Sequence, residues 1–161
     1  MRLAILTISD SRHAKNDVSG DTLYSRAKKH QHNIIHRAIV QDERQAIIDI
    51  LRLWCNDDNV DAIMTTGGTG LTARDVTPEA VRSILDKEIE GFGEMFRMLS
   101  YEKIKTSTIQ SRCLAGVCQG TYIFALPGSP SACRDAWDML LAYQLDPKTK
   151  PCNLADIHHR L

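Results

Sequence analysis

The stretch Val60–Gly70, which reads VDAIMTTGGTG, joins an apolar segment directly to a glycine-rich turn. Val60–Thr66 has the length and the continuous apolar character of a strand that is buried on both faces. The turn Thr65–Gly70 offers main-chain N–H groups that no side chain shields, and glycine permits the positive φ that brings a chain close to an anion. We therefore expect a phosphate-binding loop after a strand; a tight strand-to-helix turn without a ligand is the alternative.

Strand-like and helical segments alternate along the chain on both sides of this loop. The other expected strands are Leu3–Ile8, Ile34–Val40 and Thr121–Leu126. The expected helices are Asp21–His32 with Ser19 as its cap, Glu43–Cys55, a segment from Phe92 to Leu99, and one that begins at Ser129-Pro130. This alternation predicts an α/β fold, a three-layer sandwich with a mainly parallel central sheet and helices on both faces. We expect one domain over residues 1–161, with a C-terminal tail at 150–161.

Polar residues follow several of the predicted strands at the point where each strand ends. Ser9-Asp10 follows the first strand, Gln41-Asp42-Glu43 the second, and Pro127-Gly128-Ser129 the last. In parallel sheets the ligand crevice lies beyond the carboxyl ends of the strands, so these residues should face the same crevice as the glycine loop. Asp42 is expected to be an acidic group of that crevice, or else the cap of the helix that begins at Glu43.

The segment Arg74–Glu79 places a cation, a carboxylate and a helix start just beyond the loop. Thr77 fits a helix cap, Pro78 the first helical position, and Glu79 the acidic first turn. Arg74 is suited to pair with a phosphate, and Asp75 to hold a divalent cation on one. The alternatives are a surface ion pair for Arg74 and helix-capping electrostatics for the two acidic residues.

Composition restricts the partners and the compartment. The 161 residues include 20 Lys and Arg against 20 Asp and Glu, which gives no electrostatic case for nucleic acid or for a membrane surface. Five cysteines without a Cys-x-x-Cys pair argue against a disulfide framework and a zinc site, so we expect mostly buried, reduced thiols in a cytoplasmic protein. No Ser-His-Asp arrangement or Gly-x-Ser-x-Gly motif indicates a hydrolase.

Some aromatic and polar side chains carry less specific signals. Trp54 and Trp137 lie on apolar helical faces and are expected in the core, whereas scattered histidines are expected in solvent: His13, His30, His32 and His36. Three residues between predicted elements keep two interpretations, contact with a nucleotide phosphate or a plain loop or cap role: Ser107, Ser111 and Arg112.

Three linked motifs resemble the molybdopterin-binding domain family of molybdenum cofactor biosynthesis: Thr65–Gly70, Arg74–Glu79 and Pro127-Gly128-Ser129-Pro130. Further segments that fit this family are Ser9-Asp10, Asp17 with Ser19-Gly20, and Gly91–Glu94. The resemblance therefore spans nearly the whole chain. Phe96–Ser100 and Pro151–Asn153 resemble the branch of the family known as protein B.

The resemblance implies a trimeric or hexameric α/β protein whose catalytic relatives activate molybdopterin. The terminal phosphate of molybdopterin attacks the α-phosphate of Mg-ATP, which yields adenylylated molybdopterin and pyrophosphate. Position by position, the two functional aspartates of the family fall on Asp42 and Asp75, which are the expected catalytic residues and Mg²⁺ ligands. The residues expected to bind substrate or phosphate are Ser9, Asp10, Thr66, Gly67, Gly68, Thr69, Gly70, Arg74, Pro127, Gly128 and Ser129.

One position departs from the pattern of the family. Gln41 stands where proline usually precedes the aspartate, and proline there would fix φ on the approach to Asp42. The retained pair of aspartates favours the enzyme. The alternatives are a binding module of the same fold that holds molybdopterin or a nucleotide without turnover, and an oligomeric scaffold.

Overall fold

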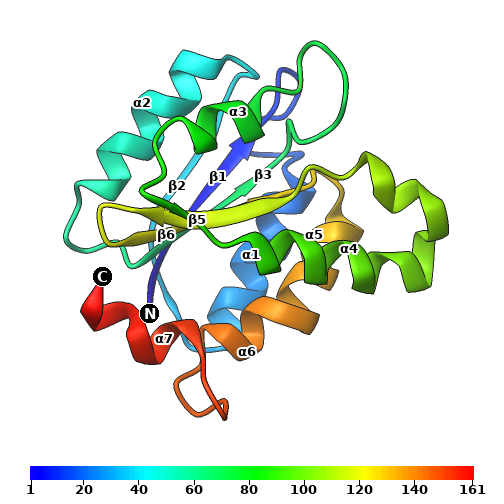
Figure 1. The fold of residues 1–161 in the computed structure, drawn as a ribbon. Helices are drawn as coiled ribbons and strands as arrows, with labels where there is room; N and C mark the ends of the chain where they lie inside the picture. The colour runs from blue at the N-terminus through cyan, green and yellow to red at the C-terminus, as the bar shows by residue number, and fades with distance from the viewer.

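A six-stranded sheet forms the centre of the computed structural model, which describes residues 1–161 (Figure 1). Its strands are β1 Arg2–Ile8, β2 Asn33–Val40, β3 Ala62–Thr66, β4 Lys87–Glu88, β5 Leu114–Cys118 and β6 Thr121–Leu126. Their order across the sheet is β2-β1-β3-β6-β5-β4. The first four strands of this order are parallel, whereas β5 runs antiparallel to both β6 and β4. The predicted mainly parallel sheet is therefore confirmed.

Helices cover both faces of the sheet, as Figure 1 shows. They are α1 Val18–Lys29, α2 Arg44–Cys55, α3 Thr77–Arg82, α4 Glu90–Ile104, α5 Pro130–Ala136, α6 Ala142–Gln144 and α7 Leu154–Ile157. A π-helical segment, Trp137–Leu141, connects α5 to α6, and 3₁₀ turns occupy Lys105–Gln110 and His158–Arg160. None of these helices combines the length and the hydropathy of a membrane span.

Two buried clusters show why the sheet needs helices on both sides. Along β1, Leu3 and Ile5 pack into a cluster with α1, α4 and α5, whereas Ala4 and Leu6 pack into a second cluster with α2 and α3. This alternation follows from the two-residue side-chain period of a strand. It confirms the three-layer α/β architecture. The tryptophans are buried as expected, and the cysteines are free thiols of which Cys152 alone is exposed.

The strand β5 is a part of the sheet that our sequence-based prediction omitted. It forms a hairpin with β6 through Gln119 and Gly120, whose φ values are 50° and 82°. A two-residue hairpin turn of the type that matches strand twist requires positive φ at both positions. The sequence did carry a signal for this hairpin: the apolar run Leu114–Cys118 is followed by Gln119-Gly120, a pair that suits a tight turn, and then by β6.

The start of α1 also differs from the prediction. The helix begins at Val18, and Asp17 is its cap, because the Asp17 carboxylate accepts a hydrogen bond from the Gly20 N–H at 2.9 Å. The prediction that Ser19 is the cap is wrong: its hydroxyl instead donates to the Gly128 carbonyl oxygen at 2.7 Å. A residue expected at the helix boundary therefore ties α1 to the loop after β6.

The prediction that all the histidines are solvated is wrong for His32. This side chain is only 8% exposed and meets the edge of the buried Trp137 ring. Burial, followed by the charges of the N-terminal ammonium and His30, lowers the pKa of His32 to about 4. Nδ1 of His30 accepts a hydrogen bond of 2.9 Å from Nε1 of Trp137, so this ring also helps to hold the tryptophan.

Candidate functional site

The loops at the carboxyl ends of β1, β2, β3 and β6 border two adjoining cavities. The smaller cavity, of about 270 Å³, is lined by Thr7, Ile8, Ser9, Arg12, Asp17, Ser19, Asp42, Thr66, Gly67, Gly68, Asp75 and Gly128. The larger one, of about 450 Å³, reaches from the glycine loop to α4 and α5. Gly68, Asp75 and Gly128 border both cavities, which makes these three residues the boundary between them. The predicted crevice is present at the predicted edge of the sheet.

The glycine loop takes a conformation that requires glycine at two positions. Gly67 and Gly68 have φ values of 112° and 63°. A Cβ on Gly67 would lie 2.1 Å from the Ile8 carbonyl oxygen, so the loop passes directly over the end of β1. The Thr77 hydroxyl donates to the Gly67 carbonyl oxygen at 2.9 Å, and the Thr77 N–H to that of Gly68 at 3.0 Å. Thr77 thus anchors the loop to α3, where we had expected it to cap that helix.

Asp42 lies against this loop, and its carboxylate accepts a hydrogen bond from the Asp10 N–H but forms no ion pair. A Cβ on Gly68 would lie 2.9 Å from Oδ1 of Asp42. Burial, together with repulsion from Asp10, raises the pKa of Asp42. The helix α2 begins at Arg44 after Glu43, so Asp42 is not its cap. Of the two interpretations of Asp42, the structure supports a carboxylate at the cavity.

Asp75 borders both cavities and is held in one orientation. Its Oδ2 accepts hydrogen bonds from the Thr72 N–H at 2.8 Å and the Thr72 hydroxyl at 2.6 Å. Burial alone would raise the pKa of Asp75, but the bonds from Thr72 and from the Gly70 N–H lower it overall. The group is therefore an ionised carboxylate at neutral pH.

The two carboxylates fit a magnesium ion that arrives with a phosphate. Mg²⁺ prefers oxygen ligands and is commonly held by one or two carboxylates together with water and substrate phosphates. No group of three or more His, Cys, Asp or Glu side chains that could hold a metal ion is present. Two carboxylates would leave the other positions around such an ion to water and to phosphate oxygens.

Arg112 braces the segment that carries Asp75. Its guanidinium donates to the carbonyl oxygens of Gly70 and Asp75, each at 2.7 Å, and forms an ion pair with Glu79. Of the two interpretations left open for Arg112, the structure shows the loop role. Ser111 borders the larger cavity, whereas Ser107 is exposed on a 3₁₀ turn outside both cavities.

Two expected phosphate contacts are engaged elsewhere in this structure. The Thr66 hydroxyl donates to the Pro127 carbonyl oxygen at 2.9 Å and is buried, so it cannot also donate to a phosphate. Arg74 forms a forked ion pair with Asp10, with N–O distances of 2.7 and 3.1 Å, and neither residue lines the two cavities. The surface ion pair, which was the alternative for Arg74, is what the structure shows.

The remaining expected residues fall in the two cavities, together with several that sequence reasoning missed. Thr69, Gly70, Pro127 and Ser129 line the larger cavity, and Ser9 lines the smaller one. Missed residues in the larger cavity are Phe96, Ser100, Lys103, Ile104, Gln110, Ser131, Ala132 and Asp135. Most lie on α4 and α5. Phe96 and Ser100 belong to a segment that carried the resemblance to the protein B branch, but no signal in the sequence placed any of these residues at the crevice, because only the packing of the helices turns them toward it.

The comparisons with known proteins agree with the fold and the loops. Residues 4–147 match the family described as "probable molybdopterin binding domain". The chain is 50% identical over 152 residues to molybdenum cofactor biosynthesis protein B of Escherichia coli (strain K12), which covers 94% of this chain and 89% of that protein. It is 46% identical over 149 residues to protein B of Staphylococcus epidermidis, covering 90% and 85% of the two chains.

A solved structure shows the same architecture. A crystal structure of molybdenum cofactor biosynthesis protein B is similar with a TM-score of 0.90 and 38% identity, covering 99% of this chain and 96% of that chain. The family match, the sequence identity and the shared fold all extend over most of the chain. The chain therefore belongs to the molybdopterin-binding domain family of molybdenum cofactor biosynthesis.

Proposed function

We propose that this protein is a molybdopterin adenylyltransferase, which transfers AMP from Mg-ATP to the terminal phosphate of molybdopterin and releases pyrophosphate. The observation that carries the proposal is that Asp42 and Asp75 border one cavity with the main chain of Gly67 and Gly68. The names of the relatives support the pathway, and the two carboxylates that line one cavity with the glycine loop support the reaction.

The chemistry requires positioning and neutralisation of charge. An oxygen of the molybdopterin phosphate forms a bond to the α-phosphorus of ATP, and the bond from that phosphorus to the bridging oxygen breaks, so that pyrophosphate leaves with the electron pair. Such transfers need no covalent nucleophile from the protein. Bound Mg²⁺ neutralises phosphate charge, and Asp42 and Asp75 are the residues that would hold it.

The protein's own contribution is a preorganised set of dipoles and carboxylates. The glycine loop is held by two bonds: the Gly67 N–H donates to the Leu126 carbonyl oxygen at 3.1 Å, and the Thr77 hydroxyl donates to the Gly67 carbonyl oxygen. The Gly68 N–H makes no hydrogen bond within the chain, so it is the loop donor that can meet a phosphate without rearrangement. The larger cavity adjoins the smaller one and offers Phe96 and Ser111 among its walls, which suits the organic part of a substrate.

The test is to incubate the protein with molybdopterin, Mg²⁺ and ATP and to measure adenylylated product and pyrophosphate. Asp42→Asn and Asp75→Asn should each lower turnover by roughly 100-fold or more, because each removes a charge that acts on the phosphates. Asp58→Asn is the matched control, since Asp58 is exposed and remote from both cavities. Full turnover by Asp75→Asn at saturating ligand would refute the assignment, and binding without pyrophosphate release would make the protein a binding module.

We also propose that the protein is a homo-oligomer. Five large apolar side chains are exposed along α4 and the 3₁₀ turn after it: Met95, Met98, Tyr101, Ile104 and Ile109. Successive residues of this set on α4 are three positions apart and are therefore neighbours, so they form a stripe that winds around about half of the helix from Met95 to Ile104. A second copy of this chain is the expected cover. Light scattering on the purified protein should give a trimer or a hexamer, and a monomer at micromolar concentration would contradict this proposal.

A further inference from the structure

Arg12 is the one basic residue among those that line the smaller cavity. The cavity also holds three carboxylates, those of Asp17, Asp42 and Asp75. Sequence reasoning assigned the phosphate-binding cation to Arg74, which lies outside the cavity and is neutralised by Asp10. The structure therefore leaves the role of that cation to be filled by a residue that carries no motif.

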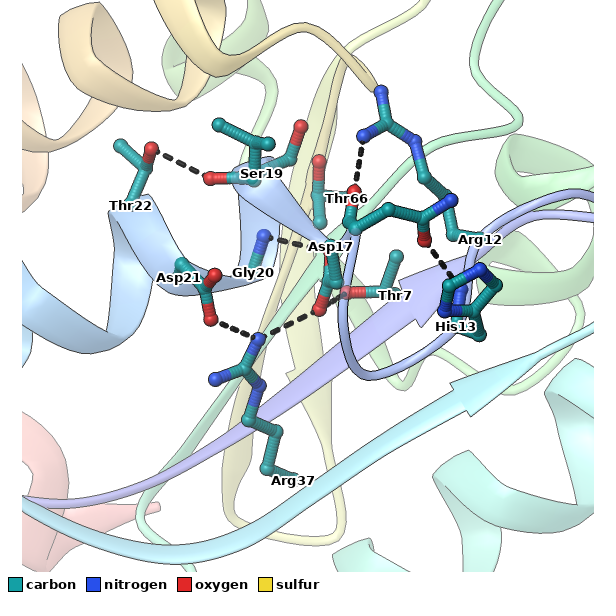
Figure 2. A network of polar contacts seen from close by, with 12 residues as sticks. Thr7, Arg12, His13, Asp17, Ser19, Gly20, Asp21, Thr22, Arg37 and Thr66 are labelled. Carbon is teal, nitrogen blue, oxygen red and sulfur yellow. Dashed lines mark hydrogen bonds and ion pairs between the residues drawn. The ribbon is translucent and has the colours of Figure 1, made fainter.

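The loop that bears Arg12 is fixed at both ends. Its far end is Asp17, which is 1% exposed and accepts hydrogen bonds from the Thr7 hydroxyl and the Gly20 N–H, both at 2.9 Å (Figure 2). At its near end, the Ser9 hydroxyl oxygen accepts a hydrogen bond from the Arg12 N–H at 3.2 Å. The loop therefore presents Arg12 from a defined position.

Asp17 does not need Arg12 as its counter-ion. Arg37 donates to the Asp17 carboxylate at 2.8 Å and to Asp21 at 2.7 Å. Figure 2 shows Arg37 pointing into this group, whereas the Arg12 side chain is directed away from it. The buried charge of Asp17 is thus already compensated, and the charge of Arg12 is left for the cavity.

The Arg12 guanidinium has no carboxylate partner. Its one hydrogen bond to the protein is to the main-chain carbonyl oxygen of Asn16, at 2.5 Å, and it forms no ion pair. An arginine has five N–H donors in a planar fork that matches phosphate oxygens. A half-buried guanidinium without an ion-pair partner thus lies in the same cavity as two carboxylates, Asp42 and Asp75, that have no cationic partner within hydrogen-bond distance, an arrangement that suits an anion arriving with a cation.

We propose that Arg12 is a phosphate-binding residue of this site, and that its guanidinium contacts a phosphate group that enters the smaller cavity together with Mg²⁺. The inference rests on the proposed function for the identity of the substrate, though the contact itself requires only a phosphate anion. Both the pyrophosphate part of a nucleotide and a phosphate monoester have this chemistry. The experiment below separates the two sources.

The test is titration calorimetry in the presence of Mg²⁺, with inorganic pyrophosphate in one arm and inorganic phosphate in the other. Arg12→Gln should weaken binding at least tenfold in one arm, and that arm identifies the group held. Arg12→Lys, which keeps the charge but not the fork, should recover part of the loss and should bind more weakly as salt rises. Arg52→Gln is the matched control, because Arg52 is exposed on α2 and forms no ion pair.

Thermal unfolding and turnover complete the test. The melting temperature of Arg12→Gln should stay within about 2 °C of the parent, because Arg12 makes one hydrogen bond to a main-chain oxygen. Unchanged affinity of Arg12→Gln for both anions overturns the proposal, as does an unmodified protein that binds neither anion.

Turnover separates this proposal from the proposed function. If the unmodified protein forms adenylylated product and Arg12→Gln keeps its kcat/KM, the role of Arg12 is refuted and the proposed function stands. A parent without product whose Arg12→Gln variant still loses anion affinity refutes the enzyme and leaves Arg12 as assigned.

Discussion

Arg112 donates a hydrogen bond of 2.7 Å to the main-chain oxygen of Asp75, although 37 residues separate them in the chain. Arg112 lies just before β5, whereas Asp75 lies in the loop that leads to α3. The contact therefore ties the antiparallel edge of the sheet to a carboxylate of the candidate site. Because the same guanidinium also holds the Gly70 oxygen, it fixes both ends of the segment that positions the Asp75 side chain.

Arg112→Ala should loosen that segment and reduce activity without removing a substrate contact. The loss of two charge-assisted bonds to main-chain oxygens should cost about 2 kcal/mol of unfolding free energy. Urea denaturation measures the cost, and the adenylylation assay should show lower kcat. Arg82→Ala, which breaks an exposed ion pair with Glu88, is the control and should cost less than about 1 kcal/mol. Equal costs for the two variants would contradict the bracing role.

Gly67→Ala should be strongly destabilising. At its φ of 112° a Cβ is strained, and it would meet the Ile8 carbonyl oxygen at 2.1 Å. The expected cost is about 3 kcal/mol or more, since the end of β1 must move. Gly91→Ala is the matched change, because a Cβ on Gly91 meets nothing within 4 Å and lies in the first turn of α4. It should be neutral or stabilise by up to about 1 kcal/mol in the same denaturation assay, and an equally damaging Gly91→Ala would undermine this account.

Asp17→Asn should test the buried charge beneath the Arg12 loop. The substitution leaves the Arg37 guanidinium without its buried partner and turns an amide donor toward other donors, at an expected cost of about 3 kcal/mol. Asp21→Asn alters the other carboxylate on Arg37, but its side chain is 58% exposed and should cost less than about 1 kcal/mol. A difference between the two midpoints of chemical denaturation smaller than the experimental error would argue against a stabilising role for Asp17.

His32 should make the protein less stable in mild acid. In the folded state its pKa is lowered from 6.5 to about 4, so between these values the unfolded chain binds the proton and the folded chain does not. The contribution is therefore intact above pH 6.5 and is lost as the pH falls, by about 2 kcal/mol between pH 7 and pH 5. His32→Gln should flatten this dependence in urea denaturation at the two pH values, whereas His13→Gln, at an exposed site, should leave it unchanged. If the unmodified protein had the same free energy of unfolding at pH 7 and at pH 5, folding would not lower the pKa of His32, and this account would be wrong.

The parallel half of the fold was predictable because each of its strands carries its own signal. The continuous apolar run of β3 and the loop that follows it define a buried parallel strand and its carboxyl end without tertiary information. The strand β4 has only two residues, Lys87 and Glu88, and both are exposed, so no hydrophobic pattern marks it. The start of α1 was misplaced because a tertiary hydrogen bond decides it: the Ser19 hydroxyl donates to the Gly128 carbonyl oxygen and so does not cap the helix.

The residues of the candidate site likewise divide into those that the sequence could identify and those that it could not. Gly67 and Gly68 were identified because the backbone conformation itself restricts the residue type at these positions. The sequence analysis chose Arg74 and did not consider Arg12, because the pairing of Arg74 with Asp10 depends on how two loops 64 residues apart approach each other. A charged residue is free for a ligand only when no carboxylate reaches it, and that is a property of the folded chain.

The place of β6 in the sheet has a consequence for synthesis of the protein. The strand lies between β3 and β5 but comes after both β3 and β5 in the chain, and its end supplies Gly128 to the boundary of the two cavities. A nascent chain that has emerged from the ribosome as far as Gly70 contains β1, β2 and β3 together with Asp42 and the glycine loop. It lacks β6 and the Gly128 side of both cavities until residues 121–128 have been translated. A chain terminated before that point therefore lacks a central strand of the sheet and Gly128 at the boundary of the two cavities, and we expect it to be inactive.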